Sequence, residues 1–381
     1  MKKIKIFTLL AMTAFMFAAS CGKESEIDVS KEGVSLIVKL PAGLKTRAVE
    51  DPVADHSATS TIDNMVVFLL NGTTVVPHPN TTLYPTNGIE FEPTDITAEY
   101  KLIEGVPGSV NRVVVVANIP SDKLTDVKTQ GNYTAIADYA YTIASQNLGS
   151  SGDGGIENLT MMGQDTPHDA TPPQANYQEV DIVLDALTAR FEIGAVKAGT
   201  GIVPGSIDIV GVFINNVYTT AAKTTLFQFP GPWTTSPVAG VNTSAYGSVT
   251  LPTYSSYNVL RDPGNALVNV DADSKVYAYH VFAGTTDIPR LILLVKGEYQ
   301  SGYYDTTEKY FLKWITFTKF LDGGTPISTL LPNTIYKVGV GATGITIDAE
   351  HLTIEPELED FDLGVNVDIT EWVAKNVTPQ I

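Results

Sequence analysis

The sequence predicts a mainly β protein built from two tandem β-sandwich domains, with one or two short helices in the first. Of its 381 residues, 44% are hydrophobic and only 17% are charged, and the chain holds 31 Gly, 22 Pro and 17 Tyr. This composition favours strands and turns over helices or disorder. The chain is also long enough for two domains that each bury a core of their own.

The first residues have the order of a bacterial lipoprotein signal peptide. A basic start, Met1-Lys-Lys-Ile-Lys, is followed by an apolar stretch at 6–17 and by small residues just before Cys21. The alternatives are a plain secretory signal or a short membrane anchor, although the apolar stretch is too short to cross a bilayer. We therefore expect residues 1–21 to be a signal peptide with a lipidated Cys21. Because Cys21 is the only cysteine, the folded part must be stable without an intramolecular disulfide.

The charge of the chain argues against nucleic acid as a partner. The net charge is −18 at pH 7, and residues 48–381 alone hold 16 Lys or Arg against 38 Asp or Glu. A surface this acidic repels nucleic acid and anionic lipid alike. We expect no nucleic-acid partner.

Residues 34–40 predict a strand with one face in a core, because aliphatic side chains alternate there with other residues. These side chains are Val34, Leu36, Val38 and Leu40. A linker with Lys45 and Arg47 follows, and such linkers are preferred sites of proteolysis. Our hypothesis is that a trypsin-like protease cuts between Arg47 and Ala48, that residues 22–47 are removed, and that a strand of another copy replaces them. The alternative is an ordinary first strand followed by an ordinary loop.

The first domain is expected over residues 48–179. Apolar runs between turn signals predict its strands at 65–70, 73–76, 100–103, 112–119 and 159–162. Asn71-Gly72, between the first two, is a strong hairpin signal. Apolar residues recur at helical spacing over 132–146, which predicts a helix.

The second domain is expected over residues 180–350. Its first run, VDIVLDALTARFEIGAV at 180–196, changes its apolar phase after Asp185-Ala186, which fits a bulge or a passage between sheets. Further strands are predicted at 207–218, 275–283, 290–299, 309–318 and 331–340. The Pro-, Gly- and Tyr-rich stretch 229–269 predicts an external loop with a short hairpin.

Residues 351–381 form a distinct C-terminal tail. Val365, Val367 and Ile369 alternate and predict another strand, whereas Trp372 lies off this phase and either fills a pocket or marks a bulge. The tail is either the last strand of the second domain or a strand used outside the molecule, and its sequence favours neither.

No motif predicts catalysis, a metal site or a cofactor. The histidines His56, His78, His168, His280 and His351 are not at metal-ligand spacings, and no second cysteine exists for a thiolate site. His280 follows two tyrosines in a predicted strand and is interpreted as a packed structural residue. We therefore predict a protein that is not an enzyme and needs neither metal nor cofactor.

Four features in this order resemble the fimbrillins, the major fimbrial subunits of type V pili in Bacteroidales. They are the lipoprotein signal ending at Cys21, the strand before Arg47, the run 180–196, and LPNTIYKVGV at 331–340 followed by a tail. The resemblance implies two transthyretin-like β-sandwich domains. It also implies an outer-membrane lipoprotein precursor that reaches the cell surface and ends in an extracellular fimbrium.

The resemblance further implies how the subunits join. An arginine-specific protease would cut after Arg47, and the strand of Val34, Leu36, Val38 and Leu40 would leave. The tail of another copy, or of a related pilin, would enter the groove, head to tail. Carried onto this sequence, the donor residues are Val365, Val367, Ile369 and Trp372, and a chain with such a tail is a stalk subunit rather than a tip.

A different class of function is a monomeric surface lipoprotein that binds glycans or a host protein. Aromatic residues of the 229–269 stretch would stack on sugar rings. These residues are Trp233, Tyr246, Tyr254 and Tyr257. An acidic face would instead meet a host protein.

Overall fold

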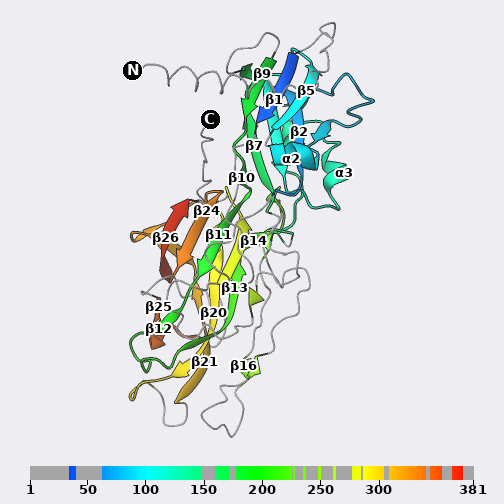
Figure 1. Cartoon of the computed structure of the whole chain (residues 1–381). Coiled ribbons are helices and arrows are strands. Elements are labelled where there is room, and N and C mark those ends of the chain that lie inside the picture. Colours follow the sequence, from blue (N-terminus) through cyan, green and yellow to red (C-terminus); the bar gives the residue numbers. More distant parts are fainter. Residues whose placement is uncertain are drawn as a thin grey trace, which may run out of the picture.

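A computed structural model of the chain describes residues 34–39, 62–98, 100–143, 145–146, 159–170, 177–224, 277–284, 286–303, 309–339, 344–353 and 363–371. It also describes four short pieces at 226–227, 235–236, 248–249 and 261–262. Within these ranges the regular structure is mostly β-strand, as the composition predicts (Figure 1). No helix in these ranges is long and apolar enough to cross a membrane.

The first half of the chain forms two sheets. The strands of the smaller sheet are β1 (Val34–Lys39), β5 (Tyr100–Val106), β8 (His168–Asp169) and β9 (Tyr177–Asp181). Those of the larger sheet are β2 (Met65–Asn71), β3 (Thr74–Val75), β4 (Gly88–Glu90), β6 (Arg112–Ala117), β7 (Met161–Asp165) and β10 (Asp185–Ala186). The smaller sheet has the order β5-β1-β9-β8, and the larger has the order β10-β7-β6-β2-β3 with β4 beside β2.

Strand β2 explains how this half is layered. Every side chain from Met65 to Leu70 is buried, because both faces of the larger sheet are covered. Met65, Val67 and Leu69 belong to the core shared with the smaller sheet. Val66, Phe68 and Leu70 belong to a second core on the opposite face, which includes residues of two short helices. The helices of this half are α2 (Pro93–Ala98), α3 (Leu124–Val127) and α4 (Tyr133–Ala137).

The predicted hairpin is confirmed. β2 and β3 pair antiparallel, with Asn71 opposite Thr74. Gly72 in the turn has a φ of +61°, a left-handed conformation that glycine adopts without strain.

The predicted helix at 132–146 is wrong beyond its first turns. Asn132 caps α4 by accepting a hydrogen bond from the backbone N–H of Ala135 at 2.9 Å, but the helix ends at Ala137. Farther on, the N–H of Ile143 donates to the carbonyl of Thr219, and the carbonyl of Tyr141 accepts from the N–H of Ala221. The backbone therefore bonds to the second half of the chain instead of to its own preceding turn. Tyr141 and Ile143 still reach the core.

The second half of the chain also forms two sheets. The strands of its larger sheet are β11 (Thr188–Ile193), β19 (Tyr277–Phe282), β22 (Lys319–Asp322), β23 (Thr325–Pro326), β24 (Thr334–Val338) and β26 (Gly364–Glu371). Those of the smaller sheet are β13 (Asp208–Asn215), β18 (Arg261–Asp262), β20 (Arg290–Glu298) and β21 (Tyr310–Phe317). The orders are β19-β11-β24-β26-β22-β23 and β18-β13-β20-β21.

Short strand pairs complete this half. They are β12 (Val196–Ala198) with β25 (Ile345–Ile347), β14 (Val217–Tyr218) with β15 (Leu226–Phe227), and β16 (Thr235–Ser236) with β17 (Ser248–Val249). A single 3-10 turn, Ala349–His351, follows β25. Within the 229–269 stretch, β18 also pairs with β13 and extends the smaller sheet at its edge.

The phase change within 180–196 is a passage between sheets. β9 pairs with β1 in the smaller sheet of the first half, β10 pairs with β7 in the larger one, and β11 pairs with β19 and β24 in the second half. Strand pairing thus changes from one half to the other at Leu187. At this junction the N–H of Leu187 donates to the carbonyl of Thr160, and the carbonyl of Leu187 accepts from Ala283.

Candidate functional site

The first strand, β1, lies inside its sheet and not at an edge (Figure 1). Five of its six residues pair antiparallel with β5, and five pair parallel with β9. In the strand order β5-β1-β9-β8, it is the only connection between β5 and β9. Without β1 the sheet would be divided, and two ladders of backbone N–H and C=O groups would lose their partners.

The side chains of β1 follow the predicted alternation. Leu36 and Val38 are 1% and 0% exposed and belong to the core between the two sheets, while Val34 is half-buried. On the other face of the strand, Ile37 is also half-buried. Leu40 lies outside the described residues. The inward residues thus fill a slot whose walls come from β5, β9 and the opposite sheet.

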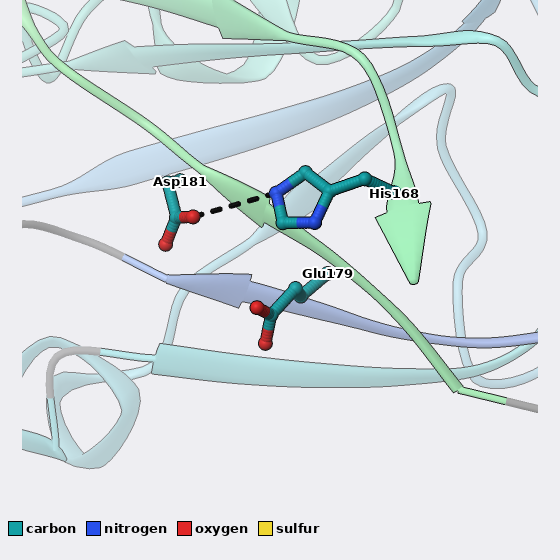
Figure 2. Close-up of side chains that lie close together, drawn as sticks. All are labelled: His168, Glu179 and Asp181. Atoms are coloured by element: carbon teal, nitrogen blue, oxygen red, sulfur yellow. Dashed lines mark ion pairs between the residues drawn. The ribbon is translucent and has the colours of Figure 1, made fainter. Parts of the chain in front are cut away.

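The outward face of β1 carries one charge, Lys39. Its ammonium forms an ion pair with Glu179 of β9, and the Glu179 side chain is only 4% exposed. Next to Glu179 lies His168 of β8, whose Nε2 is 3.4 Å from a carboxylate oxygen of Asp181 (Figure 2). One ligand atom from each of His168, Glu179 and Asp181 lies within 4.8 Å of the others. The slot therefore has an acidic wall beside β9, and the cation that faces it belongs to β1.

The pKa of the His168 imidazole is shifted by its neighbours at this wall. Its Nδ1–H donates to the carbonyl of Asp169 at 3.1 Å, and this bond is the main reason that the pKa of His168 is raised, with smaller contributions from Asp181 and Glu179. The charged form of His168 is therefore favoured beside the two carboxylates.

The predicted donor strand, β26, lies in the sheet of its own second half. It pairs antiparallel with β24 through five residues and parallel with β22 through three. Val365 and Val367 are 7% and 5% exposed and belong to the core of that half. The backbone of Ile369 pairs with Tyr336.

The remaining predicted site residues lie outside the described residues. They are Cys21, Leu40, Arg47, Ala48 and Trp372, together with the aromatic residues of the glycan hypothesis, Trp233, Tyr246, Tyr254 and Tyr257. The structure does not bring β1 and β26 together, because they belong to sheets of different halves.

Sequence reasoning misses three residues in and beside these two strands. The alternation of residues 34–40 gives no role to Lys39, and nothing local points to its partner Glu179 in β9. Leu363 is partly buried against the core just before β26. It extends the alternation to Leu363, Val365, Val367 and Ile369, so one more step of the same period-two pattern would have found it.

Two other places in the described parts of the chain bring buried or clustered polar groups together. His280 is fully buried in β19 beside Arg190 of β11, and burial followed by the nearby Arg190 charge holds its pKa well below 6.5. This fits the predicted structural role of a packed, neutral imidazole. A cavity of about 470 Å³ lies at the junction of the halves, with Asp138, Gln164, Asp185 and Lys223 among its lining residues. Nothing in its lining has the geometry of a nucleophile with its base.

Comparisons with known proteins give similarity only at the level of structure. No protein-family model matches the sequence, and no curated protein matches it. A candidate cell adhesion protein from Parabacteroides distasonis ATCC 8503 matches with a TM-score of 0.50 at 16% identity, over 92% of this chain and 99% of that one. A fimbrilin from Porphyromonas gingivalis W83 matches with a TM-score of 0.49 at 13% identity, over 89% and 98%.

A third match is a candidate cell adhesion protein from Bacteroides eggerthii DSM 20697, with a TM-score of 0.48 at 17% identity, over 89% of this chain and 95% of that one. Identities this low show a fold and not a function. The match at a TM-score of 0.50 extends over nearly the whole chain. The chain thus shares the mainly β fold that its resemblance to the fimbrillins predicts with a candidate cell adhesion protein from Parabacteroides distasonis.

Proposed function

We propose that this protein is a structural pilin that polymerises by strand exchange. It is exported as a lipoprotein precursor with lipid on Cys21, an arginine-specific protease cuts after Arg47 at the cell surface, and β1 leaves. A tail strand from another copy or a related pilin then fills the slot. The observation that carries the proposal is the position of β1: it is an interior strand, yet residues 40–64 are its only covalent link to the folded part after it.

Loss of β1 would leave a site that favours strand addition. The slot would expose apolar side chains that Leu36 and Val38 now cover, and it would expose unpaired backbone groups on β5 and β9. Unpaired strand edges recruit other strands, whose main chain gives affinity while alternate side chains fill pockets. Burial of four aliphatic side chains contributes on the order of 6–12 kcal/mol before ordering costs.

Strand β26 suits this slot because its present surroundings have the same arrangement. Like β1, it runs antiparallel to one neighbour and parallel to the other. Residues 363–369 also offer four aliphatic residues at alternate positions, as residues 34–40 do. When the two strands are aligned, Leu363, Val365, Val367 and Ile369 take the places of Val34, Leu36, Val38 and Leu40.

The exchange has a favourable direction. β26 must first leave β24 and β22, where five and three of its residues are paired, whereas the slot of β1 pairs five residues on each side. In the two aligned pairs, Leu36 and Val38 are 1% and 0% exposed, against 7% and 5% for Val365 and Val367. Transfer of the tail therefore exchanges a shorter, shallower site for a longer, deeper one.

The surroundings of the chain in this proposal are those of a cell-surface fimbrium. Within it, residues 48–179 and 180–350 act as two structural units, and residues 351–381 act as the tail. The Parabacteroides distasonis protein of similar fold is described as a candidate for cell adhesion, which fits this role. An arginine-specific protease and the outer membrane, through the lipid, are the partners of the precursor.

The proposal is tested by cutting the purified chain with an arginine-specific protease and following filament formation. The cut wild-type protein is expected to begin at Ala48 and to form filaments visible by electron microscopy. Arg47→Ala should remain monomeric. Lys45→Ala is the matched control, because it removes a neighbouring basic residue without removing the arginine, and it should polymerise normally. Normal filaments from uncut Arg47→Ala protein would show that removal of β1 is not needed.

A further inference from the structure

The acidic wall beside β9 consists of Glu179 and Asp181, and it lies next to Lys39 of β1. The proposed cleavage would remove Lys39 together with β1. Lys39 lies opposite Asp181 in the pairing of β1 with β9, and its ammonium reaches Glu179. On the other side of β1, Lys39 lies opposite Tyr100, which is half exposed. The charges that face this position on the outward surface therefore come from β8 and β9, where His168 partly offsets two carboxylates (Figure 2).

Glu179 makes this position selective because it is almost fully buried. Its side chain is 4% exposed, whereas the side chain of Asp181 is 64% exposed. A buried carboxylate is poorly stabilised by water, so it depends on charge that the protein supplies. The strand that occupies the slot supplies part of that charge through its outward residue at the place of Lys39.

We propose, on the basis of the function proposed above, that Glu179 and Asp181 make the vacated slot select its incoming strand by charge. A strand with Lys or Arg at the place of Lys39 binds tightly, and one with Asp or Glu there binds weakly. The preferred occupant is thus the tail of a pilin that carries a basic residue at this position.

The tail of this chain does not carry one. In the alignment that places Leu363, Val365, Val367 and Ile369 on the four aliphatic residues of β1, Asp368 takes the place of Lys39. A like charge beside Glu179 disfavours binding, because like-charge contacts across an interface are a principal means of excluding a partner. The slot therefore binds a copy of this chain less tightly than a related subunit with a basic residue in place of Asp368.

Synthetic peptides test this selection on the full protein after cleavage following Arg47. Tail peptides of residues 361–372 are compared as wild type, as Asp368→Lys, and as Gly364→Lys, which introduces a lysine at the place of Ser35, away from the acidic wall. Asp368→Lys is expected to bind at least about tenfold more tightly than wild type, and Gly364→Lys is expected to change the affinity little. In protein with Glu179→Gln, the gain from Asp368→Lys should shrink.

A second measurement uses the uncut chain, so it does not depend on cleavage. Lys39→Glu should lower the thermal unfolding midpoint more than Ser35→Glu does, and Lys39→Glu combined with Glu179→Lys should recover most of that loss. Equal affinity of the wild-type and Asp368→Lys peptides, or no recovery in the charge-swapped protein, overturns the charge selection alone. If no peptide binds the cleaved protein, the strand exchange and the selection fall together.

Discussion

Strands β1 and β26 occupy similar places in the two halves of the molecule, but they are held differently. Each is an interior strand with one antiparallel and one parallel neighbour. Five of the six residues of β1 pair on each side, and Leu36 and Val38 are 1% and 0% exposed. β26 has only three paired residues on its parallel side, and Val365 and Val367 are 7% and 5% exposed.

The difference indicates which strand can leave without help. β26 lies near the C-terminal end of the chain in a shallower site, so it can detach by local opening of one end. β1 is held on both sides and joined covalently through residues 40–64, so a cut is needed before it can leave. Polymerisation would thus be controlled by the removal of β1 from the subunit that accepts a tail, and not by the release of β26 from the subunit that donates one.

The largest expected effect comes from fixing β26 in its own sheet. Lys337 and Asp368 face each other across β24 and β26, and opposite residues of antiparallel strands have the spacing that a disulfide needs. In a Cys21→Ala background, Lys337→Cys with Asp368→Cys should abolish polymerisation of the cut protein under oxidising conditions. A reducing agent should restore the filaments. The single change Lys337→Cys is the control, and undiminished filaments from the oxidised double variant would exclude β26 as the donor.

A buried charge in β1 should separate the precursor from the filament. Val38→Asp places a carboxylate in a site that is 0% exposed, so the uncut protein should lose about 3 kcal/mol or more in its free energy of unfolding. After cleavage β1 is no longer part of the structure, so filaments of this variant should resist denaturant as wild-type filaments do. Val367→Asp should instead weaken the precursor and the filament alike. A filament that Val38→Asp destabilises would mean that β1 stays in place.

Matched truncations compare the depth of the two sites. Val38→Ala should destabilise the uncut protein by about 2 kcal/mol, and Val367→Ala, at the aligned position, should destabilise it by slightly less because that valine is 5% exposed. Denaturant unfolding of the two variants beside wild type measures the difference. Equal losses would remove the argument that the slot of β1 is the deeper one.

The two halves should respond to acid in opposite directions. The pKa of His280 is held well below 6.5, so this group contributes stability to the second half above pH 6.5 and the contribution is lost as the pH falls toward the folded pKa. The pKa of His168 is raised, so its contribution in the first half is present below pH 6.5 and is lost as the pH rises through the folded pKa. Trp314 is fully buried in β21, so its fluorescence reports the second half.

His280→Gln should therefore make the unfolding of the second half, followed by tryptophan fluorescence, less sensitive to pH below 6.5. His168→Gln is the matched control, and it should leave that pH dependence unchanged. An unaltered acid response in His280→Gln would assign the sensitivity to other groups.

The sequence predicts the strands themselves better than their neighbours. The alternation of Leu36 and Val38 correctly predicts a strand with a buried face. The phase change near Asp185 predicts a bulge or a passage between sheets, and the structure has the passage. The parallel pairing of β1 with β9 joins residues about 140 positions apart, and local alternation carries no information on such a partner. The helix at 132–146 was overextended because its apolar spacing is compatible with a helix, while the hydrogen bonds that end it come from Thr219 and Ala221.

The acidic wall shows a second limit of sequence reasoning. Lys39 and Glu179 are unremarkable in the sequence, since isolated charges on strands usually face water. Their ion pair exists only because β1 and β9 are neighbours in the sheet. In β26, by contrast, the period-two pattern identified the buried valines, but it could not tell whether they fill a site in the same chain or in another.

The mixed neighbours of β1 have a consequence for the shape of any assembly. A strand that takes the course of β1 runs antiparallel to β5 and parallel to β9, so all copies that insert as β1 does enter in the same direction. Every subunit added this way would point the same way as the one before it, and the two ends of the fibre would differ. One end would always present an empty groove and the other a free tail. A molecule that fills the groove would stop growth at the first end, and one that binds the tail would stop growth at the second.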